Sequence, residues 1–264
     1  MQIATQGLVL RETEYKDADK ILTVLTREGG KRTVRARGCR RRGSRLTAAA
    51  QLLVWSDMTL FEYRDRYTLN EADALDQFLG VRSDLDRLAL ASYFAEVTEA
   101  AAEEGRPDGA LLSLILNSLY ALDRLKKPLP LVKAAFELKL LCITGYEPLV
   151  DACAVCGTPE PEQPRLSLGE GVIHCAACRV GRGISLPLDA SALAAMRHIV
   201  LGNPKRLFSF ELEKESLRLL SDACQAFLLT QMDRGFRTLD FYRRLSVPDT
   251  PTQTGEGQHA QKGK

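Results

Sequence analysis

The hydrophobic periodicity of this chain changes once, near residue 80, and that change limits the folds available to it. Before residue 80, short runs rich in β-branched residues alternate between apolar and polar with a period of two, as strands do. From residue 83 onward, apolar residues recur every three or four positions, as they do in helices that bury one face. We therefore expect an α+β protein, with a β-rich unit over residues 1–80 and an all-α unit over residues 81–247.

Five short strands are expected in the first unit, at 7–11, 20–26, 32–37, 52–63 and 67–72. Turn-forming residues separate them. In the third strand, alternation places Val34 and Ala36 on one face. Arg35 and Arg37 then lie on the other face. Because the OB-fold is the commonest way to close five strands into a small barrel, we expect an N-terminal five-stranded OB-fold barrel.

Helix-capping residues mark the second unit. Helices are expected to begin at Ser83 (with Asp86 three residues later), at Asp108, and at Pro128 or Pro130. The first and third of these are expected to end at glycines 105 and 145, and two further helices are expected near 189–201 and 211–232. Residues 248–264 contain no Leu, Ile, Val or aromatic residue, so this tail cannot bury a core and is expected to be disordered.

Four cysteines form two C-x₂-C pairs that are separated by eighteen residues: Cys153, Cys156, Cys175 and Cys178. This spacing is typical of a zinc site, because two such turns supply four thiolates to one tetrahedral ion. A hairpin over 166–173 is expected to bring the pairs together. Four protein ligands leave no open position for water, so we expect one structural Zn²⁺ in a module over residues 151–182. His174 is an alternative ligand that could replace one cysteine. A redox role for the two pairs is a further alternative, but the sequence shows no thioredoxin-like βαβ pattern around them.

Positive charge is concentrated in one segment. Residues 27–45 contain nine Lys or Arg and one acid, whereas the whole chain has a net charge of only +2. Guanidinium groups pair bidentately with phosphates, so the segment predicts a nucleic-acid site. The candidate residues are Lys31, Arg32, Arg35, Arg37, Arg40, Arg41, Arg42 and Arg45, with Tyr67 as a platform for stacking bases. Trp55, Phe61 and Tyr63 are further candidates for stacking, although half or more of these aromatics are expected in the barrel core. The alternative is a solvated surface.

Several classes of function lack their motifs. There is no phosphate-binding G-x-x-x-x-G-K-[ST] loop and no G-x-G-x-x-G after a strand. Asp17 and Asp19 form a D-x-D pattern, a weak nuclease signal that is more often a polar turn. No catalytic residues are assigned, and we expect a protein that is not an enzyme. No apolar run approaches the ~20 residues that span a bilayer, and the N-terminus lacks secretion features, so a cytoplasmic protein is expected.

The chain resembles the bacterial RecO family of recombination-mediator proteins. The matching segments are Gly7–Arg11, Asp19–Thr26, Gly30, Ala36–Gly38, Ser44–Leu46, Leu140–Leu141, Gly145–Pro148, the four cysteines and Phe236–Tyr242. The resemblance covers residues 1–247 in order, and the N-terminal strand pattern joined to the zinc spacing is its most specific part. Some members of the family lack the cysteines, so the metal is not essential to the activity of the family in general.

The resemblance implies an OB-fold, a helical domain and an inserted zinc module. It further implies binding of single- and double-stranded DNA, annealing of complementary strands, and loading of RecA, together with RecR and often RecF, onto DNA coated by single-strand-binding protein. The family also docks the acidic, apolar tail of that coating protein on its helical domain. Here Lys133, Phe136 and Lys139 are the candidates for that site, because they share or neighbour one side of a helix.

Two other functions remain open from the sequence. One is an RNA- or ribosome-associated protein that combines an OB-fold with a zinc ribbon. The other is a metal-dependent nuclease that uses Asp17 and Asp19. Strand annealing without ATP or Mg²⁺ favours the DNA mediator, and a preference for structured RNA favours the first alternative.

Overall fold

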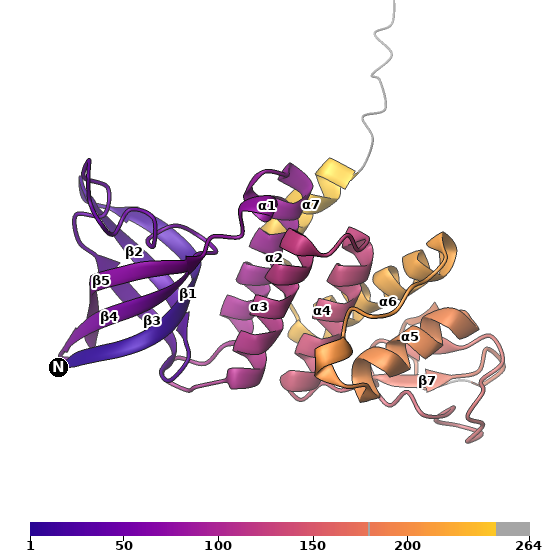
Figure 1. The fold of residues 1–264 in the computed structure, drawn as a ribbon. Coiled ribbons are helices and arrows are strands. Elements are labelled where there is room, and N and C mark those ends of the chain that lie inside the picture. The colour runs from indigo at the N-terminus through magenta and orange to yellow at the C-terminus, as the bar shows by residue number, and fades with distance from the viewer. Residues whose placement is uncertain (179, 247–264) are drawn as a thin grey trace, which may run out of the picture.

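The computed structural model describes residues 1–178 and 180–246, and it places a closed barrel before a helical region (Figure 1). The barrel strands are β1 (Gln2–Tyr15), β2 (Asp19–Thr26), β3 (Gly30–Ala36), β4 (Trp55–Tyr63) and β5 (Arg66–Asp76). Their order is β1-β2-β3-β5-β4, and β1 also pairs with β4 to close the barrel. The expected five-stranded barrel and the helices after it are confirmed.

Strand β1 is nearly three times as long as its hydrophobic pattern predicts, because its two halves pair with different neighbours. Its first half, to Leu8, pairs with β4, and its second half, from Gly7 to Tyr15, pairs with β2. A shift in register between Val9 and Arg11 bends the strand between the two partners. The end of the strand, Arg11–Tyr15, is exposed and mostly polar, so no alternation marks it in the sequence.

The barrel has its own apolar interior. Val9, Leu22, Val34 and Leu69 are each at most 2% exposed and pack together there. Strands β3 and β5 run parallel and pair only over Val34–Ala36 on β3. The contact between these two strands is therefore short. The predicted alternation along β3 is confirmed, because Val34 is buried while Arg37, just beyond the strand, is exposed.

The helices are α1 (Leu79–Arg82), α2 (Leu85–Ala101), α3 (Gly109–Arg124), α4 (Leu129–Ile143), α5 (Ala190–Leu201), α6 (Lys214–Met232) and α7 (Arg237–Ser246). Asp84, not Ser83, caps α2, since its carboxylate accepts a hydrogen bond from the backbone N–H of Arg87. The expected caps at Asp108 and Pro128 are confirmed.

Helix α2 ends at Ala101 rather than at Gly105, because the next residues return to the barrel. The backbone N–H of Lys31 donates to the carbonyl of Glu103, and the N–H of Gly105 donates to the carbonyl of Lys31. Gly30 packs against the backbone of Arg106 so closely that an added Cβ would lie 2.1 Å from its carbonyl oxygen. This contact fastens the β2–β3 turn to the segment after α2.

The core of the helical region contains one buried ionic group among aromatic side chains. The rings of Phe94 and Phe136 stack with centroids 4.0 Å apart. Beside them, the Lys133 ammonium lies 2.8 Å from a carboxylate oxygen of Glu137, and Tyr93 donates its hydroxyl to the same carboxylate at 2.7 Å. Because buried charges are expensive unless paired and hydrogen-bonded, these three side chains form one unit.

The cysteine-rich insert between α4 and α5 folds around a small sheet. Its strands are β6 (Arg165–Ser167), β7 (Val172–His174) and β8 (Ser185–Pro187), in the order β7-β6-β8. The expected hairpin over 166–173 is therefore present. The insert lies at the opposite end of the molecule from the barrel (Figure 1).

The sequence also made predictions about membrane spans and about the C-terminal tail. Across the described residues, no helix is both long enough and apolar enough to span a membrane. The predicted disordered tail at 248–264 lies outside the described residues.

Candidate nucleic-acid interface and metal centre

The arginine-rich segment between β3 and β4 is anchored rather than loose. A carboxylate oxygen of Asp19 accepts a hydrogen bond from the backbone N–H of Gly38 at 2.8 Å. The N–H of Arg40 donates to the carbonyl of Ala18, and the side chain of Cys39 is buried in the barrel interior. These contacts fix the first half of the segment.

The predicted basic residues form two groups: those engaged with other groups of the chain, and those that are exposed without an ion pair among the described residues. Two arginines of the first group form ion pairs. Arg35 pairs with Asp19 at 2.6 Å and Arg40 pairs with Glu14 at 3.0 Å. Each of these charges is therefore partly neutralised within the chain.

Lys31 and Arg32 are engaged by other parts of the fold. The Lys31 ammonium donates to the carbonyl oxygen of Glu99, at the end of α2. Arg32 lies on the face of β3 opposite to Arg35, where its guanidinium sits 4.8 Å from the ring centre of Tyr67. Lys31 therefore joins the barrel to α2, and Arg32 joins β3 to β5 within the barrel, which the strand pattern alone does not reveal.

Four arginines of the predicted set remain exposed and form no ion pair among the described residues: Arg37, Arg41, Arg42 and Arg45. Their guanidinium groups are solvated, so a phosphate can bind them without first breaking a salt bridge. They follow directly after β3 and form the strongest candidate for a polyanion-binding surface.

The aromatic residues of the barrel divide in the same way. Trp55 is 9% exposed and belongs to the core shared with the helices, so it offers no stacking platform. Tyr67 is partly buried and covered by Arg32. Tyr63 is 59% exposed at the end of β4, and Tyr15, at the end of β1, is 41% exposed with the Arg35 guanidinium 5.2 Å from its ring centre.

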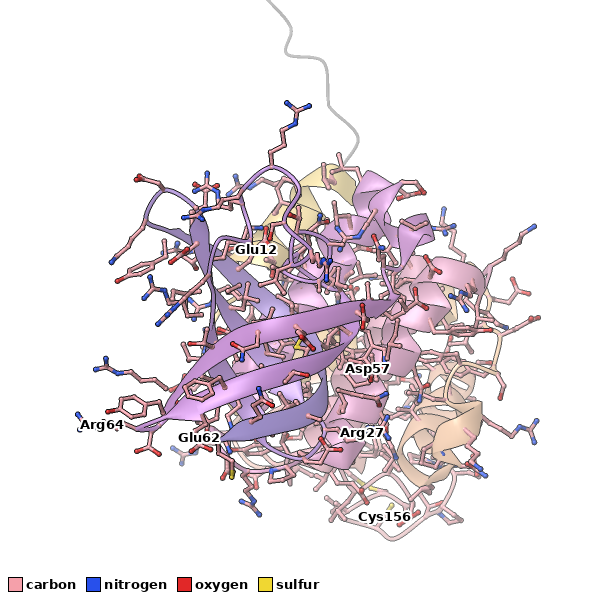
Figure 2. The ribbon with its side chains drawn as sticks, turned by 60° about the vertical axis from the view of Figure 1, so that its left-hand side comes forward. Glu12, Arg27, Asp57, Glu62, Arg64 and Cys156 are labelled. Carbon is pink, nitrogen blue, oxygen red and sulfur yellow. The ribbon has the colours of Figure 1, made fainter. Side chains whose placement is uncertain are left out.

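Sequence reasoning missed Tyr15 and two cations, Arg64 and Arg66, of the β4–β5 turn. Both cations are exposed, and Figure 2 shows Arg64 at the outer tip of that hairpin. The expected strands over 52–63 and 67–72 already indicated a turn between them. In the structure, Arg64 and Asp65 occupy the left-handed region expected of a tight two-residue turn. Tyr15 stands two residues before the D-x-D pattern.

Asp19 has a structural role in this surface. The N–H of Gly38, and next the guanidinium of Arg35, hold the pKa of Asp19 below its usual value. Its carboxylate is therefore occupied by the loop that it anchors. Among the described residues, the only group of three or more potential metal ligands is the cysteine cluster, so Asp17 and Asp19 do not belong to such a group.

The four cysteines converge as their spacing predicts. The sulfur atoms of Cys153, Cys156, Cys175 and Cys178 all lie within 4.8 Å of one another, and the Cys156 and Cys175 sulfurs are 3.7 Å apart. Ligands at the Zn–S length of ~2.3 Å in a tetrahedron are separated by roughly 3.8 Å. The arrangement therefore fits a tetrahedral four-sulfur metal centre.

Backbone N–H groups prepare the cluster for an ion. Partial desolvation opposes ionisation of Cys153, but hydrogen bonds from the N–H groups of Cys156, Cys175 and Val155 lower its pKa to about 6. Desolvation, and then hydrogen bonding to the neighbouring sulfurs, raises the pKa of Cys178 to about 12. Because a metal ion neutralises the repulsion between thiolates, it allows all four to ionise together.

His174 is not placed as a ligand. Its Nδ1 lies 2.9 Å from the carbonyl oxygen of Cys175, and its Nε2 lies 2.9 Å from the hydroxyl of Ser185. Both ring nitrogens thus have partners inside the insert. The alternative in which His174 replaces a cysteine is not supported.

The prediction of a partner site on α4 is wrong, because its residues do not form an exposed surface. It requires an exposed cation beside an apolar groove, but Lys133 is 4% exposed and paired with Glu137. Phe136 is fully buried. Lys139 is partly exposed, and its ammonium donates to the carbonyls of Ile199 and Val200 on α5. Helix α4 is central and packed against other helices on several sides, so its apparently amphipathic pattern does not mark a free face.

Comparison with known families agrees with this architecture. The family model described as "Recombination protein O N terminal" matches residues 1–78, and that described as "Recombination protein O C terminal" matches residues 82–240. The chain belongs to the RecO family. The first match corresponds to the barrel and the second to the helical region with its insert, so the RecO resemblance seen in the sequence is confirmed.

Curated RecO proteins match over almost their full length. The DNA repair protein RecO of Acetivibrio thermocellus is 33% identical over 244 residues, which cover 92% of this chain and 97% of the relative. That of Symbiobacterium thermophilum is 34% identical, over 90% of this chain and 96% of the relative. That of Anaeromyxobacter dehalogenans strain 2CP-1 is 35% identical, over 86% and 91% respectively.

Proposed function

We propose that this RecO-family chain is a non-enzymatic mediator of DNA repair and homologous recombination that binds single- and double-stranded DNA and anneals complementary strands. One observation carries the proposal: Arg37, Arg41, Arg42 and Arg45, which are exposed and form no ion pair among the described residues, lie together in one segment of a closed barrel. Phosphates are present on every nucleic-acid strand, so this surface holds DNA of any sequence.

Annealing follows from the same chemistry. Two complementary strands repel one another through their phosphates, and a protein that neutralises some of this charge lowers the barrier to pairing. Tyr15, whose ring lies against the Arg35 guanidinium, and Tyr63, at the end of β4, are exposed and available to stack on unpaired bases. No nucleotide cofactor is needed for either step.

Family membership supports the partners. We propose that the chain acts with RecR, and with RecF where present, to load RecA onto DNA coated by single-strand-binding protein, in the cytoplasm at the nucleoid. The tail of the coating protein is the further partner that the family implies. Helix α4 offers this tail no free cation, because Lys133 and Lys139 are both engaged within the fold.

For the insert we propose one structural Zn²⁺ bound by Cys153, Cys156, Cys175 and Cys178. Four thiolates are the ligands of closed zinc sites, and such sites contribute to folding rather than to catalysis. The cluster and the barrel lie at opposite ends of the molecule (Figure 1), so we expect the ion to act away from the proposed DNA surface.

The decisive experiment measures annealing of complementary oligonucleotides that have been coated with the cognate single-strand-binding protein, without ATP. The wild-type protein is expected to accelerate annealing, and Arg41→Ala/Arg42→Ala to lose most of that acceleration. Lys205→Ala/Arg206→Ala is the matched control, because it removes two exposed cations from the segment between α5 and α6, outside the barrel. If the wild-type chain fails to anneal DNA and binds structured RNA in preference, the RNA-associated alternative replaces this proposal.

A further inference from the structure

A cleft of about 800 Å³ lies where the barrel meets the helices, and the proposed function does not use it. Strand β1 contributes Leu10, Arg11 and Glu12 to one wall, and β3 contributes Lys31. Helix α2 forms the opposite wall. The start of α7 and the link that precedes it complete the lining with Arg234, Arg237 and Thr238.

The carboxylates of this cleft already have partners. Glu99 pairs with Arg11 at 2.8 Å, and Glu12 pairs with Lys20 at 2.8 Å. Glu96 accepts hydrogen bonds from both the backbone N–H and the hydroxyl of Thr238, at the beginning of α7. Glu96 therefore caps a helix and is bound by neutral donors.

The cations of the cleft are less well matched. In the part of the chain that the structure describes, the Lys31 ammonium bonds only to a backbone carbonyl, that of Glu99, at 2.9 Å. Arg234 stacks on the ring of Phe236, with 5.0 Å between the guanidinium carbon and the ring centre, and it pairs with no carboxylate among the described residues. Arg237 is exposed, and within residues 1–178 and 180–246 it likewise forms no ion pair. Positive charge is thus in surplus at the cleft.

Such a surplus selects for an anion. Concave walls of low dielectric concentrate the field of the cations that line them, so an anion is held there more strongly than on a flat surface. Guanidinium groups bind phosphate oxygens in a bidentate fork, and two of them stand at this mouth. The volume of the cleft exceeds that of a single ion and suits a phosphate that belongs to a larger molecule.

We propose that this cleft binds a phosphate group, with Arg234 and Arg237 as its principal donors. The proposal rests on the proposed function in one respect, since we take the phosphate to belong to a DNA strand already held by the barrel. Strand β1 reaches from this cleft to Tyr15, beside the basic segment, so a strand that leaves the arginines has a route along the protein. A free phosphate has the same chemistry and is the other source.

Two lengths of single-stranded DNA test the proposal. A strand of about 8 nucleotides falls within the site size of one OB-fold, whereas one of about 30 nucleotides extends beyond it. Arg234→Ala/Arg237→Ala is expected to weaken binding of the long strand roughly tenfold. Loss of two phosphate contacts also reduces the slope of log K against log[salt] by about 1.4 on single strands. Binding of the short strand is expected to be unchanged.

Several controls keep the test decisive. Arg234→Gln/Arg237→Gln retains part of each side-chain stem, so agreement between the two double variants excludes a folding defect as the cause. Lys205→Ala/Arg206→Ala removes two exposed cations outside the cleft and is expected to leave the length dependence intact.

A phosphate arm separates the two sources. If orthophosphate raises the melting temperature of the wild type but not of the Arg234/Arg237 variants, while DNA binding is unaffected, the cleft takes free phosphate. If neither DNA binding nor the phosphate response changes, the proposal is overturned. If the wild type binds no DNA at all, the proposed function fails, and the phosphate arm still decides the cleft.

Discussion

The carboxylate of Asp19 receives two hydrogen bonds from the guanidinium of Arg35, at 2.6 and 2.9 Å. Its other oxygen accepts the N–H of Gly38 at 2.8 Å. A single acidic side chain on β2 therefore ties β3 to the beginning of the arginine-rich segment. It brings order to the surface proposed to bind DNA, although its own charge is negative.

Asp19→Asn should loosen this segment. The N–H of Gly38 and the guanidinium of Arg35 lower the pKa of Asp19, so its stabilising contribution is present above the unfolded-state pKa of about 4 and is lost as the pH falls through the lower folded-state value. The amide-exchange protection factor of Gly38 should thus be constant from neutral pH to about pH 5 and fall at lower pH. In the variant it should be lower and independent of pH. Equal protection in both proteins would show that the carboxylate does not anchor the segment.

Gly30→Ala should destabilise the junction between barrel and helices. Gly30 has φ +63°, and its added Cβ would lie 2.1 Å from the carbonyl oxygen of Arg106. The matched control is Gly43→Ala, where φ is +78° but no atom lies within 4 Å of the new Cβ. Left-handed backbone alone costs roughly 1–2 kcal/mol, so urea unfolding should give that loss at Gly43 and a larger loss at Gly30. Similar losses at the two sites would contradict the close contact.

Lys133→Met should be strongly destabilising, because it leaves the Glu137 carboxylate buried without its cation. Removing one partner of a buried pair costs about 3–5 kcal/mol. Lys133→Met/Glu137→Gln should recover more than half of this loss, since the amide oxygen can still accept the hydroxyl of Tyr93.

The pH dependence of Lys133→Met provides a second measurement. Burial raises the pKa of Glu137, against the opposing effect of the Lys133 ammonium. Without that ammonium the folded state should hold its proton more tightly, so the loss measured by urea unfolding should be smaller at pH 4 than at pH 8. A loss that is independent of pH would mean that Glu137 is not charged in the wild type.

Removal of the metal should affect folding more than DNA binding. Protein purified under reducing conditions should contain about one Zn²⁺ per chain, as measured by plasma mass spectrometry. Structural zinc contributes on the order of 10 kcal/mol to small sites, so Cys175→Ser should lower the melting temperature of the helical region. Cys142→Ser, which changes a cysteine outside the cluster, should retain the metal. Zinc-free wild-type protein with an unchanged melting temperature would refute the assignment.

The salt dependence of binding counts the arginines that contact phosphates. If Arg37, Arg41, Arg42 and Arg45 each contact one phosphate, the slope of log K against log[salt] should be near −2.8 on single strands of about 8 nucleotides, which do not reach the cleft. Arg41→Ala/Arg42→Ala should reduce it by about 1.4 and weaken all sequences equally. Arg32→Ala should leave the slope almost unchanged, because that guanidinium covers Tyr67. An equal effect of Arg32 and Arg41 would contradict the division drawn from the structure.

The sequence by itself determined the features that depend on local spacing. Alternation along β3 places Val34 inside and Arg37 outside, because successive side chains of a strand point to opposite faces. The two C-x₂-C pairs predict their own convergence, because each turn directs two sulfurs to one centre. The cap at Asp108 could be predicted for the same reason, since a cap acts within one turn of its helix, whereas the choice between Pro128 and Pro130 stayed open until the structure showed Pro128.

Only the tertiary structure decided which polar side chains are free. Lys31 and Arg32 stand in the same basic run as Arg41, yet α2 and Tyr67 occupy them. Lys133 is buried for a similar reason, because Glu137 and Tyr93 surround it in a helix packed on several sides. Periodicity states which residues share a face, but it contains no information on what lies opposite that face. The availability of a charge is set by partners that are distant in sequence, and these become neighbours only when the chain has folded.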